Sequence, residues 1–85
     1  MNLVMARSAR RGVSAMTPKA RAALLRRLEA IALRPFGEHA NVTALKGAPD
    51  LFRLRQGDWR AVYVVDREAQ EVQVLDVAPR GSVYR

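Results

Sequence analysis

Residues 51–66 read LFRLRQGDWRAVYVVD, and this stretch predicts a hairpin of two antiparallel strands, over residues 51–55 and 59–66. The turn between them is Gln56-Gly57-Asp58, where the glycine can supply the positive φ that a tight hairpin needs. A third strand is expected over residues 71–78, beyond the polar loop of residues 67–70. Three consecutive strands joined by short loops predict an antiparallel sheet at the C-terminal half of the chain.

The arginines of this hairpin fall on one face when the strands are read with a period of two. Phe52 and Leu54 point to one side of the first strand, and Arg53 and Arg55 point to the other. Arg60 alternates away from the apolar residues of the second strand, so pairing brings it beside Arg53 and Arg55. Three guanidiniums on a half-open face repel one another unless an anion bridges them, which favours a phosphate site. The alternative is that Arg60 pairs with a neighbouring aspartate.

The N-terminal half predicts a strand followed by two helices. Residues 3–6 read as a short strand, and residues 8–16 as a short helix. Thr17 as N-cap and Pro18 at the first helical position begin a second helix, which ends before Pro35. Its core stripe consists of Leu24, Leu28 and Ile31, widened by Leu25 and Ala32.

These elements predict an α+β fold of order β-α-α-β-β-β, in which an antiparallel helix pair covers one face of a small antiparallel sheet. Residues 35–50 show no convincing periodicity and read as a connector, in which His39 is expected to be a loop residue rather than a catalyst. We treat residues 1–85 as a single domain, because a chain of this length holds only one core.

The strong positive charge of the chain indicates which kinds of partner it can bind. The chain has 15 Lys+Arg against 8 Asp+Glu, a net charge of +7, and a pI near 11.3. This balance points to nucleic acid, an anionic membrane or an acidic protein. The absence of cysteine excludes a disulfide scaffold and a thiolate zinc site, and we expect no metal or cofactor. No stretch is apolar enough for a signal peptide or a membrane span, so a cytoplasmic protein is expected.

Three motifs between residues 45 and 85 carry a family resemblance. They read LKG at residues 45–47, FRLRQGDWRAVY at residues 52–63 and RGSVYR at residues 80–85. They resemble the LKG, YRLRxGDYRxxY and HRxxVY signatures of the RelE/ParE superfamily of toxin–antitoxin toxins, and in particular its RelE branch. The resemblance implies the RelE fold and a ribosome-dependent endoribonuclease that cleaves mRNA, inhibits translation and is neutralised by an antitoxin protein.

The same resemblance assigns the site residues. It implies catalytic roles for Arg60, Arg80 and Tyr84, and RNA or phosphate binding by Lys46, Arg53 and Arg55. Arginine stabilises phosphorane charge but is a poor proton acceptor, because its pKa stays above about 12. A tyrosine near a pKa of about 10 is a more credible base when cations surround it, which favours Tyr84.

The alternatives differ in mechanism. Relatives often have lysine at one or both of the positions of Arg53 and Arg55, and many have Gly-His where this chain has Ala78-Pro79. A ParE-like inhibitor of DNA gyrase and an attenuated, antitoxin-binding relative therefore stay open beside the nuclease. Each of them implies a hetero-oligomer with a cognate antitoxin. The nuclease also implies contact with the ribosome and mRNA, and none implies a membrane.

Overall fold

The three C-terminal strands form as the alternation predicts. The computed structural model describes residues 1–80, in which β3 spans Leu51–Gln56, β4 spans Trp59–Asp66 and β5 spans Glu71–Pro79. Both connections are antiparallel hairpins, and Gly57 in the first turn has a φ of 59°. This is the left-handed conformation that glycine adopts without steric cost.

The sheet has five strands in the order β1-β5-β4-β3-β2. The α+β prediction is confirmed, with two differences in the sheet. β1 (Asn2–Met5) pairs with β5 in parallel, so the sheet is mixed rather than purely antiparallel. The expected connector contains a further strand, β2 (Val42–Ala44), which pairs antiparallel with β3 at the edge. Three residues are too few to show a period of two, which is why the sequence did not reveal this strand.

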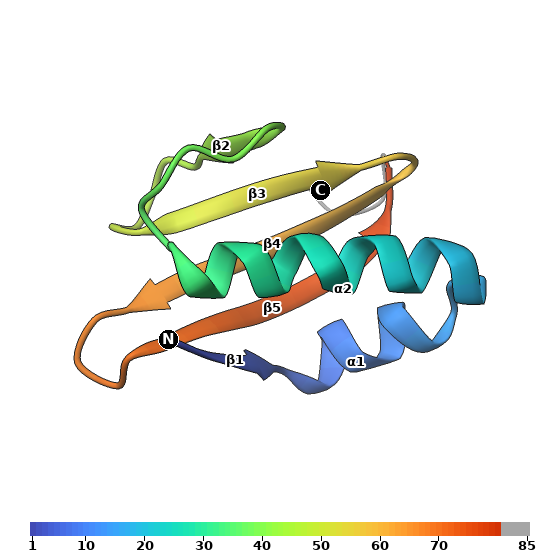
Figure 1. Cartoon of the computed structure of the whole chain (residues 1–85), viewed down its shortest axis with the longest axis horizontal. Helices are drawn as coiled ribbons and strands as arrows, with labels where there is room; N and C mark the ends of the chain where they lie inside the picture. The colour runs from blue at the N-terminus through green and yellow to red at the C-terminus, as the bar shows by residue number, and fades with distance from the viewer. Residues whose placement is uncertain (81–85) are drawn as a thin grey trace.

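Both helices lie on the same side of the sheet, as Figure 1 shows. α1 spans Arg7–Ser14, and α2 spans Pro18–Leu33. The predicted cap at Thr17 is present, because its hydroxyl accepts a hydrogen bond from the Ala20 N–H at 3.3 Å. The two helices run in opposite directions across the sheet, α2 in front of the central strands and α1 beside β5.

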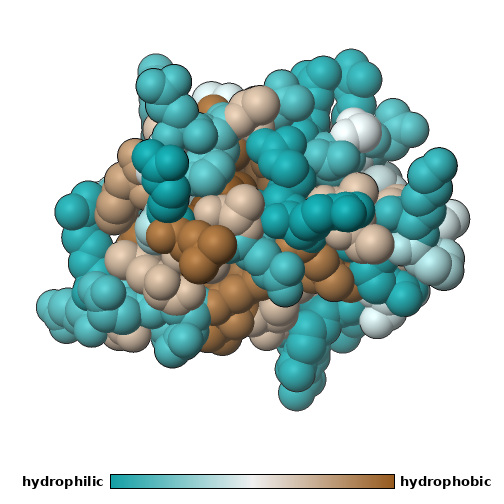
Figure 2. All heavy atoms as spheres, viewed as in Figure 1, coloured by the Kyte–Doolittle hydropathy of each residue, from teal (hydrophilic) through white to brown (hydrophobic). Residues whose placement is uncertain are grey.

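The hydrophobic core lies between the helices and the sheet. Its fully buried members come from every layer, and they include Leu24, Leu28, Ile31, Leu54, Tyr63, Val72 and Val74. Trp59 also packs against this cluster, at the hairpin end of the sheet. Figure 2 shows the helix-covered side, where hydrophilic side chains surround a smaller exposed apolar area. Within residues 1–80, no helix is long and apolar enough to cross a membrane.

Gly12 explains how α1 approaches the sheet so closely. A Cβ atom at this position would lie 1.8 Å from the Val77 carbonyl oxygen and 2.7 Å from its carbonyl carbon. Real contacts of this kind stay above about 3 Å, so only glycine lets the helix backbone rest against β5 at this point. The glycine is unfavourable for the helix in isolation, and the close packing compensates for it.

Candidate phosphate-binding site

Arg53, Arg55 and Arg60 occupy one face of the β3–β4 hairpin. Arg55 lies directly opposite Arg60 in the strand pairing, and Arg53 lies opposite Val62, two residues further along. The alternating neighbours Leu54 and Ala61 are fully buried beneath the helices. The three arginines therefore point away from the helices, on the opposite side of the sheet. We call these three residues the arginine cluster.

The arginine cluster has no acidic partner in the described part of the chain. The only ion pair found within residues 1–80 joins Arg67 to Asp50, at 2.8 Å, outside this cluster. Arg60 is half-buried, and its Nε atom is buried with no hydrogen-bond partner among these residues. A buried, unpaired donor destabilises a protein by about 1–3 kcal/mol. The alternative in which a neighbouring aspartate satisfies Arg60 is therefore not observed.

A shallow hollow lies beside the cluster, at the edge of the sheet. It has a volume of about 150 Å³ and is lined by Asn41, Thr43, Arg53 and Arg55. Thr43 belongs to β2 and Asn41 immediately precedes it, so the unexpected strand forms one wall of the hollow. Sequence reasoning missed both residues, because neither lies in a recognisable motif or in a periodic segment.

The remaining predicted site residues are less closely gathered. The Arg80 N–H donates to the Asp58 carbonyl oxygen at 2.7 Å, so Arg80 lies at the same end of the hairpin as Arg55 and Arg60. Lys46 is exposed in the turn between β2 and β3, at the other end of β3 from Arg55. Tyr84, the predicted base, lies outside the described residues.

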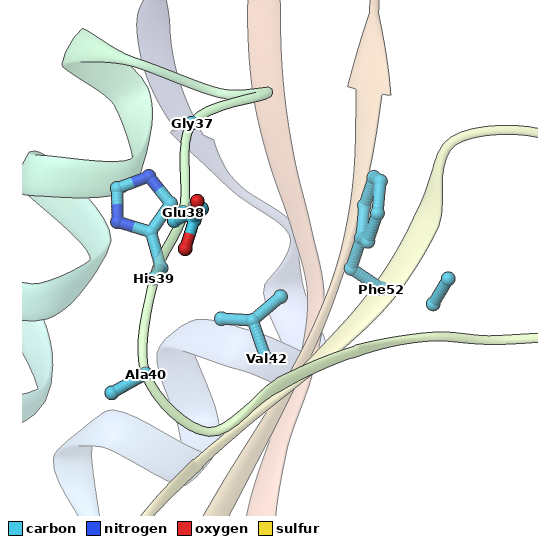
Figure 3. A pocket seen from close by; sticks show the side chains of 7 residues that line it. Gly37, Glu38, His39, Ala40, Val42 and Phe52 are labelled. Atoms are coloured by element: carbon cyan, nitrogen blue, oxygen red, sulfur yellow. The ribbon is translucent and has the colours of Figure 1, made fainter.

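A larger hollow lies on the opposite, helix-covered side of the sheet. It has a volume of about 560 Å³, and the segment after α2, the edge strand β2 and Phe52 of the neighbouring β3 line it, as Figure 3 shows. His39 is half-buried there, with its Nε2 atom 2.8 Å from the Arg34 carbonyl oxygen. None of the predicted site residues lines this hollow, so its position gives no support to a role in the predicted chemistry.

The chemistry available to the arginine cluster is that of binding and charge stabilisation. Guanidinium groups form bidentate hydrogen bonds to phosphate and do not give up a proton near neutral pH. Tyr63, the tyrosine within residues 1–80, cannot supply the missing base, because burial raises its pKa to about 12. No group of three metal-ligating side chains occurs within the same residues.

Comparison with known proteins gives structural matches. No protein-family model matches the chain, and no curated protein does. The E. coli RelE toxin matches with a TM-score of 0.80 and 26% identity, over 93% of this chain and 83% of that one. The toxin in the E. coli RelBE toxin–antitoxin complex gives 0.76 and 28%, over 92% and 94%. A YoeB/ParE toxin from Agrobacterium tumefaciens gives 0.78 and 19%, over 94% and 99%.

The class of protein follows from these matches and from the geometry described above. A basic α+β chain with two helices on one face of a five-stranded sheet has the architecture of toxins from toxin–antitoxin systems. The matches to the E. coli RelE toxin, at 26% and 28% identity, support the RelE/ParE toxin superfamily, as the motifs in residues 45–85 predicted.

Proposed function

We propose that the protein is the toxin of a type II toxin–antitoxin system and a ribosome-dependent endoribonuclease that cleaves mRNA. The observation that carries this proposal is the arginine cluster, whose side chains have no acidic partner within residues 1–80. The buried Nε of Arg60, on the same strand pair, adds a donor that has no partner among residues 1–80. A phosphate group bound between Arg55 and Arg60 would remove their repulsion and accept hydrogen bonds from their guanidinium groups.

The proposed reaction is an in-line attack of the 2′-oxygen on the adjacent phosphorus. Tyr84 takes the proton of the 2′-hydroxyl, and the bond from phosphorus to the 5′-oxygen breaks. The products are a cyclic phosphate and a 5′-hydroxyl, whose proton comes from solvent. Arg60 holds the phosphate, and Arg80 stabilises the charge of the phosphorane. Arg53 and Arg55 orient the RNA backbone.

A cognate antitoxin is the proposed regulatory partner, so the toxin would form a hetero-oligomer in the cytoplasm. The E. coli protein in the matching complex is bound to its antitoxin. In this chain, residues 1–45 hold eight basic and two acidic side chains, which suits an acidic segment that folds on contact. The same basic surface suits ribosomal RNA, and either association should weaken as salt rises.

Inducible expression with mapping of mRNA 5′ ends tests this function. We expect growth arrest and new 5′ ends within coding regions, and loss of both in Arg60→Ala and in Tyr84→Phe. Arg26→Ala is the comparison variant: it removes one charge from the basic helix surface and none from the arginine cluster, so it should weaken cleavage far less than Arg60→Ala does. Co-expression of the antitoxin should restore growth of cells that carry the wild-type chain.

Two other results would assign a different function. Arrest without new mRNA ends, accompanied by DNA damage, would favour a ParE-like gyrase inhibitor, and a YoeB/ParE toxin is among the structural matches. Absence of arrest at wild-type expression levels would favour an attenuated relative that only binds its antitoxin.

A further inference from the structure

The hollow beside the arginine cluster is built from two cross-strand pairs. Thr43 on β2 lies directly opposite Arg53 on β3. The Arg55 N–H donates to the Asn41 carbonyl oxygen at 3.0 Å, which places Asn41 next to Arg55. All four side chains line the same hollow of about 150 Å³. Each arginine thus has a neutral polar residue as its neighbour on the edge side of the sheet.

The chemistry of this hollow suits an anion with several acceptor oxygens. Its lining contains two guanidinium groups, one hydroxyl and one amide, and no carboxylate. None of these four side chains makes a hydrogen bond or an ion pair within residues 1–80. A phosphodiester has two non-bridging oxygens, so it can accept from a guanidinium and from a neutral donor at once.

We propose that Asn41 and Thr43 complete a second phosphate subsite, which holds the RNA phosphate adjoining the one that Arg60 binds. This inference rests on the proposed function, because it needs RNA on this face of the sheet. Arg55 belongs to both places, since it lines the hollow and lies opposite Arg60. Neighbouring strands are about 4.8 Å apart, so donors on β4, β3 and β2 form a row across the sheet. A nucleic-acid backbone presents anions in such a row.

The backbone conformation at Asn41 permits a variant that removes the side chain and keeps the backbone unchanged. Its φ is 62°, a left-handed conformation that glycine, asparagine and aspartate adopt most easily. Asn41→Gly therefore removes the amide and keeps the conformation. Thr43→Val removes the hydroxyl from an exposed strand position with a side chain of the same shape. Gln70→Gly is the matched control, because Gln70 also has a left-handed φ, 57°, in the loop between β4 and β5.

The experiment measures binding of a 2′-O-methyl RNA oligonucleotide, which has no free 2′-hydroxyl to attack, by fluorescence anisotropy. Neutral methylphosphonates replace one phosphate at a time. For the wild-type chain, we expect affinity to fall at the phosphate bound by Arg60 and at one adjoining phosphate. The Asn41→Gly/Thr43→Val double variant should bind about tenfold more weakly or worse, as two lost hydrogen bonds imply. Its affinity should no longer fall when the adjoining phosphate is replaced by a methylphosphonate. Gln70→Gly should match the wild type in both affinity and response.

The outcomes separate this subsite from the proposed function. If the double variant binds with wild-type affinity and responds at the same phosphates, the subsite is wrong although the RNA-cleaving function stands. If the wild-type chain neither binds the oligonucleotide nor cuts mRNA in cells, the proposed function fails and the RNA subsite fails with it. In that case, a glutamate-rich peptide is tested as well. If the wild-type chain binds this peptide and the double variant does not, the hollow is assigned to an acidic protein partner.

Discussion

Arg55 and Arg60 lie directly opposite each other on β3 and β4, with no carboxylate paired to either within residues 1–80. Side chains directly opposite in an antiparallel pair have Cβ atoms about 5 Å apart, and like charges at that spacing destabilise a sheet. The free protein therefore carries a local repulsion that an anionic ligand would relieve. Removing one of these two charges is therefore expected to raise the stability of the free protein and to lower its affinity for RNA.

Arg55→Gln tests this opposition. We expect the free energy of unfolding to rise by about 0.2–1 kcal/mol, because the repulsion across the strands is gone. RNA affinity should fall at the same time. Urea denaturation and anisotropy measured on the same samples check both effects, and the gain in stability should shrink as salt increases. Arg26→Gln, at an exposed helix position, should not raise the stability and should lower RNA affinity less than Arg55→Gln does. A loss of stability in Arg55→Gln would contradict the argument.

Gly12→Ala is expected to destabilise the fold although alanine is the better helix former. The gain in helix propensity is about 1 kcal/mol, but the new Cβ atom would lie 1.8 Å from the Val77 carbonyl oxygen. α1 must then move away from β5, and overpacking of this kind typically costs about 1–3 kcal/mol before the propensity gain is counted. The midpoint of urea unfolding measures the net effect. Ser14→Ala, at an exposed position of the same helix, should leave the midpoint unchanged or raise it.

The long helix and the hairpin strands could be predicted because alternation, turn residues and capping residues are signals within a short stretch of sequence. Strand alternation placed Arg53, Arg55 and Arg60 on one face, and Thr17 with Pro18 gave the start of α2 correctly. The parallel pairing of β1 with β5 could not be predicted in this way, because it joins residues about seventy positions apart. The need for glycine at position 12 could not be predicted either, because Gly12 approaches Val77, which lies on a strand far away in the sequence.

Less of the candidate site than of the fold could be predicted from the sequence. Its motif residues were found from their resemblance to a family, but Asn41 and Thr43 depend on β2, a strand of three residues with no periodic signal. The position of Lys46 also depends on the turn after that strand. Site residues on an edge strand of this kind can be identified only when the register of the sheet is known.

Arg67 is expected to hold the pKa of Asp50 below its ordinary value of 3.8. The guanidinium donates to both carboxylate oxygens, at 2.8 and 3.2 Å, and this hydrogen bonding is the main cause of the shift. A lowered pKa contributes stability above pH 3.8, and that contribution is lost as pH falls through the folded-state pKa. Arg67 also lies 4.2 Å over the ring of Phe36.

Arg67→Met removes the partner of Asp50. The pKa of Asp50, followed by NMR of its carboxyl carbon, should then rise towards 3.8. The part of the acid-dependent loss of stability that comes from Asp50 should disappear in the variant. Arg26→Met removes an arginine that lies away from Asp50 and should leave its titration unchanged. An unchanged Asp50 pKa in Arg67→Met would show that the ion pair does not form in solution.

The two tyrosines of the chain are expected to titrate at different pH values. Burial raises the pKa of Tyr63 to about 12 against its ordinary value of 10, and Arg27 only partly offsets this shift. Tyr63 packs against Phe52, with ring centroids 5.4 Å apart. Because the unfolded chain loses this proton near pH 10 and the folded chain near pH 12, the stability that Tyr63 contributes falls as pH rises through that interval.

Ultraviolet absorbance of tyrosinate measures both groups. If Tyr84 is the base of the proposed nuclease and the arginines of the site lower its pKa, as the family resemblance implies, the wild-type chain should show a second tyrosinate step, at lower pH than that of Tyr63. Tyr84→Phe should remove the lower step and keep the step near 12, whereas Tyr63→Phe should do the reverse. The pH profile of RNA cleavage should then rise with the lower step, because the tyrosinate is the form that accepts the proton. A single step near pH 10 that accounts for Tyr84 would mean that the arginines do not activate it, and the proton would have to leave by another route.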